Sequence, residues 1–379
     1  MDRNQSIEFV HGLLQLLVGK NGSDLFLTAD FPPAMKIDGE VIPVSQQALS
    51  GAHTAAIARS IMNDRQSAEF ERTKECNFAI KPTGVGRFRV NVFFQQGNVG
   101  IVMRTIADAI PTIEQLGLPP IIADLAMSKR GIVMVVGATG SGKSTTMAAM
   151  IGHRNERSRG HIITLEDPIE FVHPHRNSIV TQREIGVDSE DWHAALKNTL
   201  RQAPDVILIG EVRDRATMEH AIEFAETGHL VMCTLHANNT NQALDRVINM
   251  FPEDRRQQLL MDLSLNLRGI LSQRLIPKKH NAGRVAAIEI LLASPLVSDL
   301  IFKGEVVQIR EAMKSARPQG MQTFDQAIFD LHESGLISYE DALRNADSVN
   351  DLRLQIKLRS SVAGGLDGLS QDIAHLAIV

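Results

Sequence analysis

Gly137-Ala138-Thr139-Gly140-Ser141-Gly142-Lys143-Ser144 is the stretch that decides the fold of this chain of 379 residues. It fits G-x-x-x-x-G-K-[ST], a loop whose backbone N–H groups cradle nucleotide phosphates. An apolar run at 132–136 precedes it and predicts a strand, and residues 145–150 predict a helix. Glycines let the loop turn its N–H groups inward, and the helix N-terminus adds partial positive charge. The pattern predicts a nucleotide-binding loop between a strand and a helix.

Within this loop we expect Lys143 to reach the β- and γ-phosphates and the Ser144 hydroxyl to bind Mg²⁺. The ligands expected here are therefore ATP and Mg²⁺. The residues predicted to bind the nucleotide are Gly137, Ala138, Thr139, Gly140, Ser141, Gly142, Lys143, Ser144 and Thr145.

The composition predicts a globular protein of the cytoplasm. Apolar residues make up 44% and charged residues 22%, which suits a chain with a sizeable core. The apolar runs are too short for a transmembrane segment, and the N-terminus lacks a signal-peptide pattern. The two cysteines, Cys76 and Cys233, form no metal-binding pair, and Cys233 is expected to be a buried thiol. A net charge of −5 gives no general attraction to nucleic acid.

The first block of the chain reads as an α+β domain over residues 1–105. Asp38-Gly39 is a strong hairpin signal between two of its strands. Pro111 and Pro119-Pro120 predict a linker over 106–120. Helices are expected at 5–20 and 50–71, and strands at 25–27, 34–37, 41–44, 86–93 and 100–104.

From residue 121 onward, strand-like runs alternate with helices, which predicts an α/β domain with a parallel sheet covered on both faces. We expect this domain over 121–345, with helices dominating from 293. A partly mobile C-terminal tail is expected over 346–379, since residues 362–368 are rich in glycine. The strands are expected at 131–136, 161–165, 205–209, 230–235 and 284–292.

Carboxylates follow two of these strands. Glu166, Asp167 and Glu170 come after the run at 162–165, and Glu211 and Asp214 come after the run at 206–209. Ligands of open α/β sheets bind at the carboxyl ends of the strands, where both groups would lie. Phosphoryl transfer to water needs a carboxylate to orient or deprotonate the water and an acid to help hold Mg²⁺. The same acids could instead cap the helices that follow.

Histidines and arginines complete the candidate residues. A strand between His229 and His236 can place one imidazole at its C-terminal end, although each histidine alone is more often a structural hydrogen-bonding group. Arg89 and Arg104 fall in strands of the first domain, together with Arg87. Arginines often stabilise phosphate charge in P-loop enzymes, but a solvated sheet face explains these three equally well.

Four motifs together resemble the secretion-type ATPases, and within them the type IV pilus retraction ATPases of the PilT/PilU type. They are the phosphate loop at 137–144, an acidic box at 162–173, a Walker B strand at 205–214 and a histidine box at 227–238. The resemblance covers about residues 5–350. It implies an N-terminal PAS-like domain and a RecA-like P-loop ATPase domain with a helical C-terminal part.

The resemblance also implies roles for individual residues. Glu170 would activate the attacking water, and Glu211 would support Mg²⁺ and the order of the water. His229 would sense the γ-phosphate. Arg89 and Arg104 would contact the nucleotide from the N-terminal domain, across the cleft. The predicted catalytic residues are thus Glu170, Glu211, His229, Arg89 and Arg104, and the predicted metal ligands are Ser144 and Glu211.

Family members form hexameric rings that drive pilus retraction through an inner-membrane platform protein. The stretch from Pro295 to Glu305 lacks the Ala-Ile-Arg-Asn-Leu-Ile-Arg-Glu segment of the principal retraction enzyme. The four-cysteine site of extension ATPases is also missing. Both departures, with the sequence beyond 345, resemble the accessory PilU-type branch. This implies a cytoplasmic homo-hexamer, peripheral to the inner membrane, that works beside the principal retraction ATPase.

The expected function is therefore Mg²⁺-dependent ATP hydrolysis by a ring motor that powers or assists pilus retraction in twitching motility. One alternative is an accessory binding module of the principal motor whose own hydrolysis is dispensable. Another is an ATPase acting on nucleic acid, but the acidic charge and the lone Trp192 and Tyr339 offer little surface for stacking or phosphate contact. We therefore expect no nucleic-acid partner.

Overall fold

The structure is a computed structural model that describes residues 2–37, 39–106, 109–280 and 283–360. Contacts divide the chain into two units. The N-terminal unit comprises Met1–Ala109 with Glu170–Val172, and the ATPase unit comprises Ile110–Ile169 with His173–Val379.

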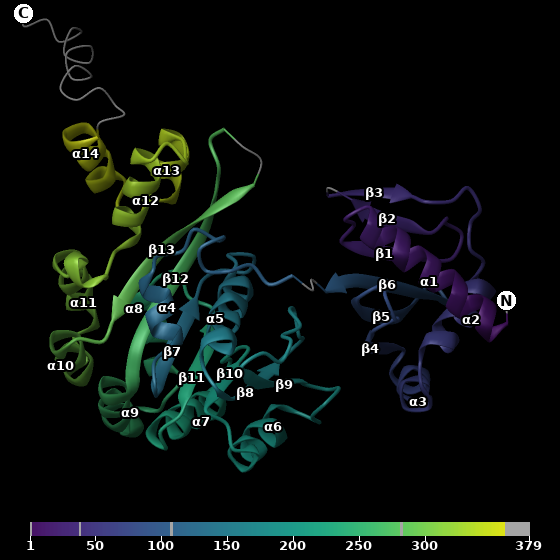
Figure 1. The fold of residues 1–379 in the computed structure, drawn as a ribbon, viewed down its shortest axis with the longest axis horizontal. Coiled ribbons are helices and arrows are strands. Elements are labelled where there is room, and N and C mark those ends of the chain that lie inside the picture. Colours follow the sequence, from purple (N-terminus) through teal and green to yellow (C-terminus); the bar gives the residue numbers. More distant parts are fainter. Residues whose placement is uncertain (1, 38, 107–108, 281–282, 361–379) are drawn as a thin grey trace, which may run out of the picture. The chain divides into compact units, whose positions relative to one another are not determined.

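The N-terminal unit is a six-stranded antiparallel sheet with three helices packed on one face (Figure 1). Its strand order is β3-β2-β1-β6-β5-β4. Alternate residues of β5 (Phe88, Val90 and Val92) are buried with the helices in one core, so the arginines between them lie on the opposite face. This α+β arrangement is compatible with the expected PAS-like domain. The elements are α1 (Arg3–Gly19), β1 (Asp24–Leu27), β2 (Ala34–Ile37), β3 (Glu40–Pro43), α2 (Gly51–Ile61), α3 (Asp64–Thr73), β4 (Glu75–Ile80), β5 (Arg87–Gln95) and β6 (Asn98–Ile106).

Two expectations for this unit need correction. The single helix expected over 50–71 is two helices, because Met62 is extended and Asn63 starts α3 with a capping box to Gln66. Strand β4 was not expected at all. The expected hairpin is present, since β2 and β3 pair through Ile37 and Glu40, whereas Asp38 lies outside the described residues.

The ATPase unit has a seven-stranded sheet in the order β13-β12-β7-β11-β10-β8-β9. Only β13 runs antiparallel to its neighbour, so the predicted α/β fold with a parallel-rich sheet is confirmed. Helices α4 and α5 pack on one face, and α6 to α11 pack on the other. The strands are β7 (Gly131–Val136), β8 (Gly160–Glu166), β9 (Ser178–Glu184), β10 (Val206–Ile209), β11 (Leu230–Leu235), β12 (Leu267–Pro277) and β13 (Arg284–Leu292).

The packed part of this unit extends further at both ends than the sequence predicted. Ile113 and Leu118, expected in a linker, are buried against α4 and α5. Beyond residue 345, where a tail was expected, α14 packs through Leu352 and Ile356 against α12 and α13 (Figure 1). The helices are α4 (Ile121–Ala126), α5 (Lys143–Arg157), α6 (Trp192–Thr199), α7 (Arg215–Glu226), α8 (Thr240–Asn249), α9 (Glu253–Asn266), α10 (Pro295–Lys303), α11 (Val306–Ser315), α12 (Phe324–Glu333), α13 (Tyr339–Asn345) and α14 (Val349–Arg359).

Candidate active site

The phosphate loop lies between the end of β7 and the start of α5. Gly140 and Gly142 have positive φ angles of 76° and 90°, which favour glycine, and Gly142 is the N-cap of α5. No side chain caps α5. The N–H groups at the start of the helix therefore have no side-chain acceptor, and this arrangement can bind an anion.

Lys143 folds back over this loop. Its Nζ donates to the carbonyl oxygens of Gly137 and Ala138 at 2.9 and 3.0 Å. Ser144 and Thr145 follow in the first turn of α5 and are half-buried. The ammonium group and both hydroxyl-bearing residues are thus gathered at the N-terminus of one helix.

Strand β12 supports the loop from the side. Ser272 pairs with Val136, so the next residue, Gln273, lies beside the start of the loop. The Gln273 side chain is buried and accepts a hydrogen bond from Thr146 Oγ1 at 2.7 Å. A Cβ at Gly142 would come within 2.7 Å of Gln273 Nε2, and the φ angle of 90° at this position also favours glycine. No local motif indicates Gln273, since its partner lies more than a hundred residues away in the sequence.

Polar side chains gather where the neighbouring strands end. Glu211 follows β10, and its Oε1 lies 3.1 Å from Nε2 of His236, which follows β11. Its other oxygen accepts from Arg213 Nε at 2.8 Å, and this hydrogen bond raises the pKa of Arg213. Arg213 also lies 3.8 Å from the carboxylate of Asp167, beyond β8. Since β7, β11, β10 and β8 are parallel neighbours, this cluster shares the sheet edge that carries the phosphate loop.

The acidic box contributes residues of two kinds. Glu166 ends β8 and accepts hydrogen bonds from Thr164 Oγ1 at 2.6 Å and from Gln182 Nε2 at 3.1 Å. Both donors are residues of β8 and β9, so these hydrogen bonds lie within the sheet. Glu170 is exposed and belongs, with the two residues after it, to the N-terminal unit. The structure therefore brings Glu211 into the polar cluster, and no described contact joins Glu170 to it.

His229 lies at the opposite edge of the sheet from this chain's phosphate loop. It precedes β11, and its carbonyl oxygen accepts from Gly131 N at 3.0 Å, where β7 begins. Its ring Nδ1 lies 3.0 Å from the Phe224 carbonyl oxygen, a structural contact. Six residues of parallel strand separate it from the loop, about 20 Å at ~3.3 Å per residue. His229 therefore does not join the polar cluster at this chain's own phosphate loop, where His236 lies, and its role at the γ-phosphate stays a prediction.

In the N-terminal unit, Arg89 and Arg104 are directly paired residues of β5 and β6. Arg104 Nε donates to Asp24 Oδ1 at 2.7 Å, and its side chain is 68% exposed while that of Asp24 is 5% exposed. The buried carboxylate fixes one side of the guanidinium, and the exposed side keeps further donors for another acceptor.

The residues of the loop edge fit a magnesium nucleotide. The oxygen donors of Ser144 and Glu211 are of the hard kind that Mg²⁺ prefers. Within the described ranges no three His, Cys, Asp or Glu side chains gather as a metal site. Mg²⁺ bound through few protein ligands and the phosphates of a nucleotide is common in such sites.

Comparison with known proteins identifies the family. Residues 4–344 match the model for "Type II/IV secretion system protein". The chain belongs to this family. It is 57% identical to "Type IV pilus ATPase PilU" of Pseudomonas aeruginosa, over 96% of this chain and 95% of that protein. It is 41% identical to "Type IV pilus retractation ATPase PilT" of the same organism, over 88% of this chain and 97% of that protein.

A solved structure agrees with both relatives. The crystal structure of the pilus retraction motor PilT with bound ADP matches with a TM-score of 0.85 and 39% identity, over 90% of this chain and 98% of that chain. The chain is therefore an ATPase of the PilT/PilU type, and its greater identity with PilU agrees with the features beyond residue 295. Of the helices in the described ranges, none combines the length and apolar character needed to span a bilayer.

Proposed function

We propose that this protein is a Mg²⁺-dependent ATPase that forms a hexameric ring and powers or assists type IV pilus retraction. The observation that supports it most is the shared sheet edge, where the phosphate loop and the Glu211–His236 pair follow parallel neighbouring strands. Similarity to PilU and PilT supports the link to pili.

In the proposed mechanism, the N–H groups of 137–145 and Lys143 bind the ATP phosphates. Ser144 and Glu211 would hold Mg²⁺, which neutralises charge on the β- and γ-phosphates when bound. Glu170 would accept a proton from the water that attacks the γ-phosphorus, while the bond from that phosphorus to the β-phosphate oxygen breaks and ADP leaves. His236 would fix the orientation of Glu211.

The proposal also includes two cationic side chains of the N-terminal unit. Arg89 and Arg104 would meet nucleotide phosphate, since the guanidinium of Arg104 is anchored by Asp24 yet largely exposed. Loss of the γ-phosphate would then weaken the contacts of these arginines with the nucleotide.

The proposed setting is the cytoplasmic side of the inner membrane. There the ring would act on the pilus platform protein together with the principal retraction ATPase. The greater identity with PilU also supports a second candidate, an accessory module of that motor whose own hydrolysis is dispensable.

Two experiments test these proposals. Purified protein should hydrolyse ATP in a manner abolished by chelating Mg²⁺, and Lys143→Ala should lose this activity; hydrolysis by Lys143→Ala at the wild-type rate would contradict the site. In cells, retraction by Lys143→Ala and Glu170→Gln strains is compared with retraction by a deletion strain. Point variants that match the deletion support the motor, and point variants that match the intact strain support the binding module.

A further inference from the structure

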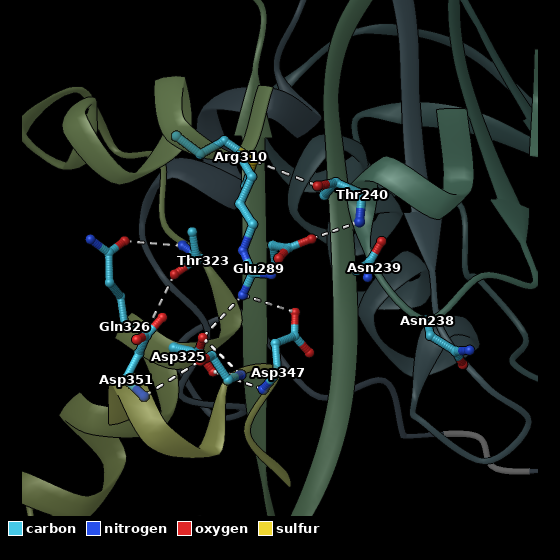
Figure 2. Close-up of polar contacts among 12 residues, drawn as sticks. Asn238, Asn239, Thr240, Glu289, Arg310, Thr323, Asp325, Gln326, Asp347 and Asp351 are labelled. Carbon is cyan, nitrogen blue, oxygen red and sulfur yellow. Dashed lines mark hydrogen bonds and ion pairs between the residues drawn. The ribbon is translucent and has the colours of Figure 1, made fainter. Parts of the chain in front are cut away.

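The segment between β11 and α8 carries His236 and is held at both ends. Arg246 Nη1 donates to the His236 carbonyl oxygen at 2.9 Å. At the other end, Thr240 N donates to the buried carboxylate of Glu289 at 2.6 Å (Figure 2). The position of residues 237–239, in the middle of the segment, depends on the further contacts made there.

Arg274 of β12 holds the middle. Its Nη2 donates to the Asn238 carbonyl oxygen at 3.2 Å and to Asp347 Oδ1 at 2.6 Å. Its Nη1 donates to the Asn345 carbonyl oxygen at 2.6 Å, and the guanidinium lies 3.9 Å from the centre of the Phe324 ring. One planar group thus joins the segment after β11 to α12, to the end of α13 and to Asp347, two residues before α14.

The far side of this contact is itself fixed. Asp347 is 10% exposed, and its Oδ2 lies 3.6 Å from Arg310 Nη2. Arg310 also pairs with the buried Asp325 at 3.0 Å, and Asp325 accepts the Asp347 N–H at 2.8 Å (Figure 2). Asp347 therefore offers Arg274 a carboxylate that cannot easily move.

The neighbouring residue on the strand links the same place to the nucleotide loop. Gln273 and Arg274 point to opposite faces of the sheet because successive strand residues alternate. Gln273 accepts from Thr146 behind the phosphate loop, and Arg274 donates to Asn238 beside His236. Two consecutive residues of β12 thus contact both halves of the candidate site.

We infer that Arg274 is a positioning residue for ATP hydrolysis: it holds the 236–239 segment so that His236 stays against Glu211, with the C-terminal helices as its anchor. The inference rests on the roles proposed for Glu211 and His236. Lysine should not replace it, since a compact ammonium group lacks both the extended planar fork that reaches these separate acceptors and the flat face that lies on the Phe324 ring.

Arg274→Lys tests this inference, with Arg317→Lys as the matched control. Arg317 pairs with Asp330 of α12 and has no described contact with Arg274, with Asp347 or with the 236–239 segment. We expect Arg274→Lys to lower kcat by about tenfold or more, with KM for ATP within about twofold, because Lys143 and the loop still bind phosphate. Arg317→Lys should keep kcat within about twofold.

Three results would overturn the inference: an unchanged kcat in Arg274→Lys, an equal loss of kcat in both variants, or a loss seen in KM alone. Should Arg274→Lys fail to fold, Asp347→Asn replaces it, and an unchanged kcat there overturns the inference too. Glu211→Gln distinguishes a failure of this inference from a failure of the proposed site. Full activity of Glu211→Gln removes the proposed site and the inference together, whereas an inactive Glu211→Gln beside an unaffected Arg274→Lys removes the inference alone.

Discussion

His236 Nε2 lies 3.1 Å from Glu211 Oε1 and joins the ends of two neighbouring parallel strands. Glu211 is 22% exposed, so its carboxylate is partly removed from water and depends on this contact and on Arg213 for its orientation. The contact ties the Walker B strand to the histidine box through side chains whose positions the sheet fixes.

His236→Ala should therefore lower kcat for ATP hydrolysis by about tenfold or more, because Glu211 loses the group that orients it. His229→Ala is the matched control, since that ring contacts Phe224 and Thr227 at the opposite edge of the sheet. Steady-state hydrolysis by both variants checks the prediction. Equal losses in the two would show that His229 also acts on the nucleotide.

The hydrogen bond behind the phosphate loop should contribute to stability. Thr146→Val keeps the side-chain shape but leaves buried Gln273 Oε1 without its donor, so the free energy of unfolding should fall by about 1–3 kcal/mol. Urea unfolding measures the change. Adding Gln273→Met removes the stranded acceptor, and the double variant should lose less than the sum of the two single variants. Simple additivity would argue against the coupling.

The sequence predicted the part of the fold around the phosphate loop because local residue patterns determine the elements there. Strands β7, β10 and β11 are short, fully buried apolar runs, and their parallel order follows from the helices between them. Strand β9 is an edge strand with Thr181, Gln182 and Arg183 at half-buried positions, so it shows no apolar run. Strand β12 begins one residue after α9 ends, and no turn residue marks the change.

The candidate site was predictable only in part for a related reason. Phosphate-loop residues follow from a contiguous motif, and Glu211 follows from its place after a strand. Choosing between His229 and His236 requires the direction of β11 relative to β7. The parallel sheet predicted from the sequence supplies that direction and places His236 at the loop edge, whereas the motif alone does not. The contacts of Gln273 and Arg274 join segments distant in sequence, so no local pattern indicates them.

Burial of His173 should make stability depend on pH. The side chain is 8% exposed, and desolvation lowers its pKa from 6.5 to about 4. The unfolded chain binds a proton at His173 below about pH 6.5, whereas the folded chain does so only near pH 4. The contribution of neutral His173 to the free energy of unfolding is therefore complete above about pH 6.5. It is lost as the pH falls to about 4, by about 3 kcal/mol in total.

Urea unfolding of the wild type and of His173→Gln between pH 4 and 7 checks this expectation. The variant lacks the titrating ring, so its free energy of unfolding should fall less steeply with acid over this range. Parallel pH profiles for the two proteins would show that His173 titrates alike in the folded and unfolded chains.

Packing of α14 predicts a contrast between two leucines on one helix. Leu352 is fully buried against α12 and α13, whereas Leu354 is 57% exposed. Leu352→Ala should lower the free energy of unfolding by about 2–5 kcal/mol through lost burial and the cavity left behind. Leu354→Ala should change it by less than about 0.5 kcal/mol. Thermal or urea unfolding of the pair decides, since two small and equal effects would mean that residues 349–359 do not belong to the packed ATPase unit.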